Sequence, residues 1–398
     1  MPRSHATRGI DLVVAGAGMA GLVAAVHATE LGARVLVLEK GDRPGGSMAL
    51  SSGVVWRYRD LETFRAQCPG GDAALQALVV ERLDGDLAWL ESLGAPVLER
   101  ETGNPLTAGA RFDVPRLIEA LARRAGEVRL REPLHELPAG VPAVLATGGF
   151  QGDPELVRRY VTPQADGLWL RACPWSTGDG LRLGLAAGAA TTAAMDEFYG
   201  RNMPAPPAAV GPGDFVRLAQ LYARHASVES EDGERYPPER VTWSETDVVQ
   251  WAARLPGARA WYVVGPGALE QRVGGRSVAE MVEVARSAGG RVERRGEALA
   301  VYVAPGITTT LGGLRVDEQA RVLAPDGRPL AGLHAAGADA GGISTGGYSS
   351  GLAAALVLGR IAAETALDER SVNRRSSSAP REGTRSAARR PGGGRRRP

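Results

Sequence analysis

The feature that most constrains this 398-residue chain is a glycine pattern near its N-terminus. Gly16, Gly18 and Gly21 form G-x-G-x-x-G directly after the apolar run LVVA, and the apolar run ARVLVLE follows one helix length later. Such glycines allow a tight turn, close approach of the backbone to a pyrophosphate, and contact between helix and strand. Glu39 ends the second run, where a carboxylate accepts hydrogen bonds from ribose hydroxyls. The sequence therefore predicts a βαβ unit that binds a dinucleotide.

Two later segments again combine a buried strand with glycines. PAVLATGG covers residues 142–149, and GLHAAGADAGG covers residues 332–342. An NAD domain would continue through further βαβ units, whereas these returns suit a flavin dinucleotide extended across a domain built from distant segments. We therefore expect FAD as the cofactor.

Changes in composition divide the chain into five stretches. The stretch 203–298 has more proline and tryptophan and lacks a phosphate-type glycine loop, which indicates an inserted domain. We expect an α/β fold, in which a Rossmann-like FAD-binding domain carries an inserted α+β capping domain. The expected boundaries are a flexible leader over 1–10, the FAD-binding domain over 11–202 and 299–368, the cap over 203–298, and a disordered arginine-rich tail over 369–398.

Composition also disfavours several classes of function. Two cysteines and five scattered histidines favour neither a disulfide framework nor a metal site. No segment reaches the ~18–20 apolar residues of a membrane span, and the phosphate-loop glycines favour a cytoplasmic segment over a signal peptide. From Ser371 onward there are nine arginines and one glutamate, so the net charge of +2 conceals an acidic body. This tail lacks aromatic residues, so we expect a solvated extension and no specific nucleic-acid partner.

Residues 60–125 contain long stretches with helical periodicity, and we expect this region to be mostly helical. DAALQALVVERLDGDLAWLESLG and VPRLIEALARRAG carry the strongest signal.

Six segments, in order from residue 11 to residue 365, resemble the flavoproteins of the fumarate reductase and succinate dehydrogenase superfamily. That group includes 3-ketosteroid dehydrogenases and tricarballylate-dehydrogenase-like proteins. The resemblance implies an FAD domain interrupted by a mobile cap, with the substrate held between them against the flavin ring. The segments are GAGMAGLVAAVHATELGARVLVLEK, RPGGSMALSSG, AVLATGGF, STGDGLRLGLAAGA, APGITTTLGGL, and GLHAAGADAGG with GLAAALVLGRIAA.

The matching motifs carry a set of FAD-binding positions onto this chain. They are Gly16, Ala17, Gly18, Gly21, Glu39, Lys40, Gly46, Ser47, Ser52, Gly53, Ala146, Thr147, Gly148, Asp179, Gly337, Asp339, Ser350 and Leu352. Asp339 is included because the family often has Glu after the glycine matching Gly337, whereas Ala338 stands here, so Asp339 is the expected ribityl contact. Ser47 falls where succinate dehydrogenases attach FAD to a histidine, so we expect noncovalent FAD.

The family's dicarboxylate contacts are replaced in this chain. Trp243 stands for the arginine that delivers a proton to fumarate, and Thr308 and Thr309 stand for a His-His pair. Near Gly346, a third family arginine is also missing. A dicarboxylate would lose its partners in such a site, so we expect a neutral or weakly polar substrate in a pocket of Trp, Tyr and Thr.

Three tyrosines are candidate bases for substrate dehydrogenation. Tyr348 precedes the helix near the flavin ring, Tyr199 lies beside Arg201 at the domain crossover, and Tyr302 precedes the threonine run. A tyrosinate can take a proton if its pKa falls from ~10 toward neutrality. The alternative for each is a half-buried structural tyrosine, and Arg201 is expected in the substrate pocket.

The expected function is an FAD-dependent dehydrogenase that sends a hydride to flavin N5 and a proton to tyrosine, with an unidentified electron acceptor. A flavin oxidase or an alkene reductase on the same scaffold is an alternative. A catalytically degenerate flavin-binding protein is another, because three fumarate-type contacts are missing together.

Overall fold

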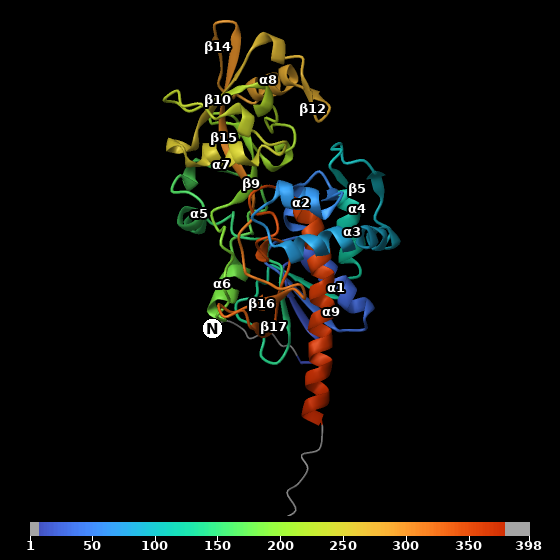
Figure 1. Ribbon diagram of the computed structural model, residues 1–398. Coiled ribbons are helices and arrows are strands. Elements are labelled where there is room, and N and C mark those ends of the chain that lie inside the picture. The colour runs from blue at the N-terminus through green and yellow to red at the C-terminus, as the bar shows by residue number, and fades with distance from the viewer. Residues whose placement is uncertain (1–7, 379–398) are drawn as a thin grey trace, which may run out of the picture.

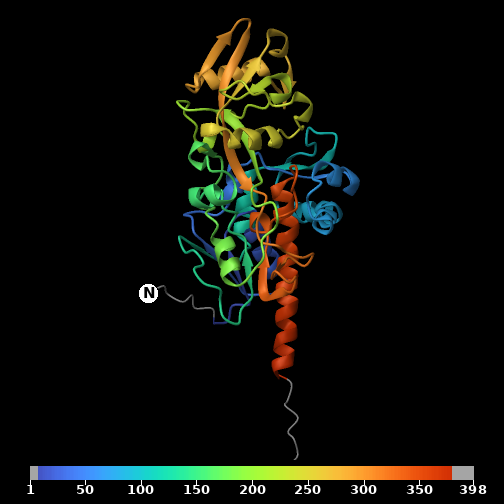
Figure 2. The same ribbon diagram turned by 60° about the vertical axis from the view of Figure 1, so that its left-hand side comes forward.

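The computed structural model describes the backbone of residues 8–378 and the side chains of residues 8–371. Two units stand one above the other, and a long C-terminal helix runs down through the larger unit (Figures 1 and 2). The outer part of the expected leader and the end of the tail lie outside the described residues. Among the described residues, no helix combines the length and apolarity that crossing a bilayer requires.

The larger unit is built on a six-stranded sheet whose central strands are parallel. Its strand order is β16-β17-β7-β1-β2-β6, and β16 alone runs antiparallel to its neighbour. Strand β1 is buried along its whole length, which explains its uninterrupted apolar run. This arrangement confirms the α/β class. The strands are β1 (Leu12–Ala15), β2 (Val35–Glu39), β6 (Glu127–Leu130), β7 (Ala143–Leu145), β16 (Arg321–Leu323) and β17 (Pro329–Ala335).

Helices α1 (Met19–Glu30) and α9 (Gly351–Ser378) pack against each other beside this sheet. Small residues allow the close approach: a Cβ at Gly359 would lie 2.7 Å from the backbone oxygen of Ala20. Both helices come from segments at opposite ends of the chain, so this contact closes the larger unit.

The expected mostly helical region is a mixed one. Helices α2 (Leu61–Gln67), α3 (Ala73–Ser92) and α4 (Val114–Ala122) form as the periodicity predicts. Between α3 and α4, however, the chain makes β4 and β5, which join β3 from before α2 in a three-stranded sheet of order β3-β5-β4. Gly109 enables this pairing, since a side chain there would strike the Val55 oxygen at 2.2 Å. The strands are β3 (Val54–Tyr58), β4 (Val97–Glu99) and β5 (Thr107–Phe112), and η1 (Gly46–Leu50) precedes them.

The smaller unit surrounds a second hydrophobic core, which includes Tyr222, Tyr262, Met281 and Val301. Its sheet has the order β10-β11-β15-β14, and β8 and β9 join it by pairing with β15. Most of this core lies within 203–298, where the cap is expected, and Val301 follows that stretch on β15. The elements are β8 (Trp169–Leu170), β9 (Phe198–Pro204), β10 (Ser227–Glu229), α7 (Thr246–Arg254), β11 (Ala260–Val264), β12 (Arg272–Val273), β13 (Arg276–Ser277), α8 (Val278–Ser287), β14 (Val292–Arg295) and β15 (Ala298–Thr310).

Two strands connect the smaller unit to the larger one. The antiparallel pair of β9 and β15 runs from the upper sheet into the region between the units (Figure 1). Strand β15 has thirteen residues and belongs to both units, so the boundary expected at 298/299 falls where this strand begins. Helices α5 (Pro154–Tyr160) and α6 (Asp179–Ala186) lie on the chain before β9.

The expectation of disorder from residue 369 onward is wrong for its first ten residues, because α9 continues to Ser378. Arg370 anchors this part of the helix: its guanidinium donates to the backbone oxygen of Asp11 at 2.7 Å and lies 3.1 Å from the Asp11 carboxylate. The last turns of α9 project away from the rest of the larger unit (Figures 1 and 2).

Candidate active site

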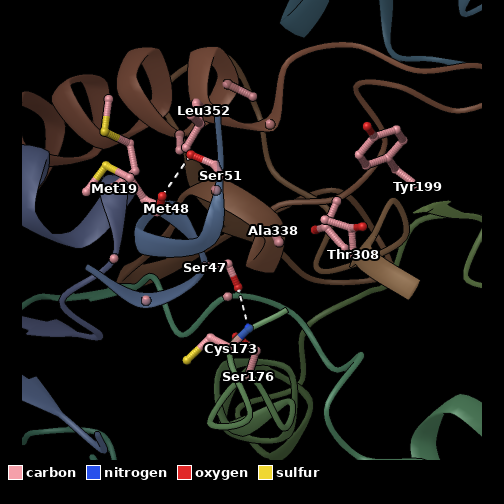
Figure 3. Close-up of a pocket in the computed structure, with 18 of the residues that line it drawn as sticks. Met19, Ser47, Met48, Ser51, Cys173, Ser176, Tyr199, Thr308, Ala338 and Leu352 are labelled. Atoms are coloured by element: carbon pink, nitrogen blue, oxygen red, sulfur yellow. Dashed lines mark hydrogen bonds between the residues drawn. The ribbon is translucent and has the colours of Figure 1, made fainter. Parts of the chain in front are cut away.

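A cavity of about 530 Å³ runs from the carboxyl ends of the parallel strands to the β9/β15 pair. Residues directly after β1, β2, β7 and β17 line one end of it, where ligands of open parallel sheets bind. In Figure 3, Met19 and Met48 lie on one side, Tyr199 and Thr308 lie on the other, and Ser47 lies between them. The cavity therefore joins the glycine loop to the predicted substrate residues.

The glycine loop is shaped by sterics that only glycine satisfies. Gly16 has φ +100°, and a Cβ there would lie 2.3 Å from the Ala146 oxygen. A Cβ at Gly21 would lie 1.9 Å from the Gly16 oxygen, so this glycine allows strand and helix to pack. Gly18 has open space instead and begins α1 without a side-chain cap or an acidic residue in the first turn. The free N–H groups and positive dipole end of this helix suit a pyrophosphate.

Glu39 is buried and holds the same loop. Its carboxylate accepts hydrogen bonds from the backbone N–H groups of Ala17 and Gly41, each at 2.6 Å. Beside it, the Lys40 ammonium lies 2.9 Å from the Asp179 carboxylate. Glu39, Lys40 and Asp179 all line the cavity. Glu39 and Asp179 are the only acidic lining residues in the described part of the chain, and both lie at this end.

Most of the other predicted cofactor positions also line the cavity. Ser47 accepts a hydrogen bond from the backbone N–H of Cys173 at 3.0 Å (Figure 3). Ala17 and Gly21 act within the loop and do not line the cavity, and Gly53 faces the Phe112 oxygen, where a Cβ would lie 2.5 Å away. The lining positions are Gly16, Gly18, Glu39, Lys40, Gly46, Ser47, Ser52, Ala146, Thr147, Gly148, Asp179, Gly337, Ser350 and Leu352.

The expected ribityl contact from Asp339 is wrong. Asp339 is buried outside the cavity lining, and its carboxylate accepts hydrogen bonds from the backbone N–H and the hydroxyl of Thr147. The Gly149 N–H adds a third, at 3.4 Å. Burial raises the pKa of Asp339 despite these bonds. This carboxyl therefore ties the turn after β17 to the loop after β7, and Ala338 lines the cavity in its place.

At the far end of the cavity, aromatic rings surround a pair of tyrosines. The rings of Tyr199 and Tyr348 are stacked, with centroids 3.6 Å apart and an angle of 12° between their planes. Trp56 meets Tyr348 edge to face at 5.7 Å, and it meets Trp243 at the same distance. The Trp243 indole N–H donates to Gln67 at 3.0 Å. Trp56, Trp243 and both tyrosines line the cavity.

Arg201 lies against this pair. Its guanidinium carbon is 5.1 Å from the centre of the Tyr199 ring, and it donates to the backbone oxygen of Ser244. Behind it, Glu245 is buried and accepts from the Ala223 N–H at 2.9 Å. Burial raises the pKa of Glu245 to about 7, although the charge of Arg201 opposes the change.

The two tyrosines differ in acidity because of their surroundings. Burial acts to raise the pKa of Tyr199, but the positive charges of Arg201 and Arg171 outweigh it, and the net effect is a lowered pKa. For Tyr348, burial and the neighbouring Tyr199 raise the pKa well above its ordinary value. Tyr199 is therefore the member of the pair that ionises first.

A second arginine, Arg171, lines the same end of the cavity and was not anticipated from the sequence. It follows β8, and its backbone N–H donates to the Ile307 oxygen of β15 at 2.8 Å. Its guanidinium donates to the Thr308 hydroxyl at 2.9 Å and to the Phe215 oxygen at 3.2 Å. Thr308 and Thr309 line the cavity as expected. Arg201 also lines the cavity, as expected, and Arg171 adds a second guanidinium to a pocket that was expected to contain Trp, Tyr and Thr.

Tyr302 is not in the site. It lies on the part of β15 inside the smaller unit, pairs with Trp261, and donates its hydroxyl to Glu231 at 2.7 Å. Partial burial and the Glu231 carboxylate raise its pKa to about 12. Because Tyr302 does not line the cavity, it is not placed to act as a base on a ligand there.

A family model described as an FAD binding domain matches residues 11–141 and 139–352 of this chain. The chain belongs to this FAD-binding family. The flavoprotein is 25% identical to a probable fumarate reductase of Shewanella frigidimarina, over 89% of this chain and 74% of that protein. The match confirms the resemblance to the fumarate reductase group, and the protein is an FAD-dependent oxidoreductase.

Solved structures share the fold of this flavoprotein. The open conformation of a flavocytochrome c3 fumarate reductase superposes with a TM-score of 0.68 at 22% identity, over 91% of this chain and 78% of that one. A 3-ketosteroid-Δ4-(5α)-dehydrogenase from Rhodococcus jostii RHA1, solved with 4-androstene-3,17-dione, gives 0.67 at 21% identity, over 92% and 99%.

The residues present fit FAD. The uncapped start of α1, the open space at Gly18 and the buried Glu39 beside it form a cradle for a pyrophosphate and a ribose. The rest of the cavity continues to Ser350 and Leu352 at the start of α9. Among the described residues, no group of His, Cys, Asp and Glu side chains is suited to hold a metal ion.

Proposed function

We propose that this flavoprotein dehydrogenates a small organic substrate, with Tyr199 as the group that receives the proton. FAD, when bound, supplies the acceptor for the hydride that leaves the substrate carbon. The observation that supports this proposal most directly is the stacked pair of Tyr199 and Tyr348 in the cavity, with Arg201 over the Tyr199 ring.

Tyr199 is suited to this role by its charge environment. A base must ionise near the working pH, and two guanidiniums favour the phenolate of Tyr199. Tyr348 stays protonated in the same range, since its pKa is raised. Trp56 and Trp243 surround the pair with apolar rings that limit access of water.

A C4-dicarboxylate is a poor match for this site. Such a substrate needs a cation for each carboxylate, and Arg201 is already engaged with the Tyr199 ring and the Ser244 oxygen. Trp243, Thr308 and Thr309 carry no charge. At the positions that match the family's dicarboxylate contacts, a second carboxylate would be desolvated without a charged partner, which costs several kcal/mol.

The test is anaerobic bleaching of the FAD-loaded protein by a panel of small acids, ketones and enones. A compound that bleaches the wild-type flavin should bleach Tyr199→Phe far more slowly, and Tyr302→Phe is the matched control because Tyr302 lies outside the cavity. Equal rates for all three proteins would exclude Tyr199 as the base.

The same assay separates the alternative functions. Oxygen consumption during turnover would indicate an oxidase, and reoxidation of the reduced flavin by an activated alkene would indicate a reductase. A flavin that dithionite reduces and no organic compound reduces would indicate a degenerate flavin-binding protein.

A further inference from the structure

The two ends of the cavity differ in charge. At the cofactor end the lining includes Glu39, Lys40 and Asp179. Elsewhere the lining includes Arg171 and Arg201 at the substrate end and Arg276 from β13 of the smaller unit, and no Asp or Glu of the described chain. The hydrogen bonds that these two guanidiniums donate go to backbone oxygens and to the Thr308 hydroxyl, and not to a carboxylate. The substrate end therefore carries positive charge that no lining carboxylate neutralises, although the buried Glu245 lies behind Arg201.

The two arginines are not equivalent. The charge of Arg201 is placed to stabilise the phenolate of Tyr199, because its guanidinium lies over that ring. Arg171 has only neutral partners, namely the Thr308 hydroxyl and the Phe215 oxygen. Burial lowers the pKa of Arg171, as expected for a cation without an anionic partner. Arg171 thus remains able to bind an anionic group of a ligand.

The lining around this cation is mostly apolar. Val216, Leu221 and Leu311 contribute aliphatic side chains, and Trp56 and Trp243 contribute rings. We propose that Arg171 and the Thr308 hydroxyl bind a carboxylate of the substrate, whose apolar carbon skeleton fills the rest of this end. The proposal rests on the proposed function, since it takes the cavity to be the substrate site.

The chemistry of the pair selects this ligand. A guanidinium presents a planar fork that matches a carboxylate, and the Thr308 hydroxyl can turn to donate to the same group. A neutral ligand would leave the buried cation without a counter-charge, whereas a carboxylate supplies one. A carboxylate with an apolar body therefore matches both the cation and its surroundings.

The experiment measures equilibrium binding to the oxidised, FAD-loaded protein through the flavin difference spectrum. The probes are two matched pairs, benzoate with benzamide and hexanoate with hexanamide, each acid and amide having nearly the same shape. We expect the acid to bind about tenfold or more tightly than its amide in at least one pair, since a charge-assisted hydrogen bond is lost in the amide.

Three variants test whether Arg171 causes the preference for the acid over its amide. Arg171→Met should abolish the preference for the acid, and Arg171→Lys should keep part of it because the charge remains. Arg259→Met is the control: Arg259 also donates to backbone oxygens, of Gly167 and Ala258, but does not line the cavity, so the preference should persist.

Equal binding of acid and amide in both pairs, or no response to either acid, would overturn the proposal. So would an acid preference that survives Arg171→Met. If that variant fails to fold, Arg171→Lys and the wild-type comparison still decide. A protein that retains FAD and is bleached by an organic reductant, yet shows no acid preference, refutes only this inference; a protein that no compound bleaches refutes the proposed function.

Discussion

Tyr199 and Tyr348 come from segments about 150 residues apart in the sequence, and their rings stack with centroids 3.6 Å apart. Tyr199 lies on β9, and Tyr348 lies in the loop before α9. The charges of Arg201 and Arg171 favour the phenolate of Tyr199. The two stacked tyrosines therefore differ in pKa, which is lowered for Tyr199 and raised for Tyr348.

The first prediction concerns pH. The rate of flavin reduction should rise with pH as Tyr199 ionises, with a midpoint below 10, since its folded-state pKa is lowered. Tyr199→Phe should reduce the rate by about 10²–10⁴-fold, the usual contribution of a general base. Tyr348→Phe removes a hydroxyl that lowers the pKa of Tyr199, so its pH profile should move to higher pH. Stopped-flow reduction at several pH values measures both effects. A profile unaltered in Tyr348→Phe would contradict the coupling.

The second prediction concerns the cofactor loop. Glu39→Arg should weaken FAD binding by about 10–100-fold, because each lost charge-assisted hydrogen bond contributes about 1.5–3 kcal/mol. The new cation would also face the unpaired N–H groups of Ala17 and Gly41. Reconstitution of the apoprotein with FAD, followed by fluorescence, gives the affinity. The exposed Glu119→Arg is the control and should bind FAD normally; equal losses would show that Glu39 has no special role.

The third prediction is that FAD is released intact by acid or heat. Ser47 accepts a hydrogen bond from the Cys173 N–H and offers no imidazole for attachment. The supernatant of denatured protein should contain all the flavin, and the pelleted protein should be colourless. Flavin that remains on the denatured chain would contradict this expectation.

The fourth prediction concerns dicarboxylates. Succinate should not bleach the flavin under anaerobic conditions, and Trp243→Arg alone should not install that activity. The new guanidinium would restore one of the family's dicarboxylate contacts, while Thr308, Thr309 and the loop near Gly346 would still lack the others. Titration followed at the visible flavin band is the direct measurement. Rapid bleaching of the wild-type flavin would mean that succinate finds two cationic partners in this site.

The fifth prediction concerns stability. Burial raises the pKa of Glu245 from 4.5 to about 7, so the folded state prefers the protonated form. The free energy of unfolding should therefore fall as pH rises between about 4.5 and about 7, by an amount on the order of 3 kcal/mol. Urea unfolding of Glu245→Gln should lack this component, whereas the exposed Glu119→Gln should retain it. Identical pH dependence in wild type and Glu245→Gln would refute the assignment.

The cofactor half of the site could be predicted because its chemistry is local in sequence. Gly16, Gly21 and Glu39 lie within one βαβ unit, whose short connections fix their geometry. The substrate half depends on tertiary contacts. Arg171 belongs to no motif, and it reaches the cavity only because β8 pairs with β15.

Tyr302 and Asp339 show two ways in which nearness in sequence misleads. Tyr302 precedes Thr308 by six residues, but in an extended strand that separation is roughly 20 Å, and β15 carries it into the other unit. Asp339 lies next to a cavity residue, but its side chain turns to Thr147, whose backbone N–H and hydroxyl both donate to it. The orientation of a side chain such as that of Asp339 depends on tertiary contacts, which a short sequence motif does not reveal.

The β9/β15 pair described above is both the connection between the two units and part of the reaction chamber. Tyr199 and Arg201 lie on one of its strands, and Thr308 and Thr309 lie on the other, whereas Tyr348 belongs to the larger unit. A twist of this ribbon that swings the smaller unit outward would pull Tyr199 off Tyr348 and weaken its acidity. The same movement would then admit the substrate and raise the pKa of Tyr199. Tyr199 would be able to accept a proton only when the two units are closed on each other.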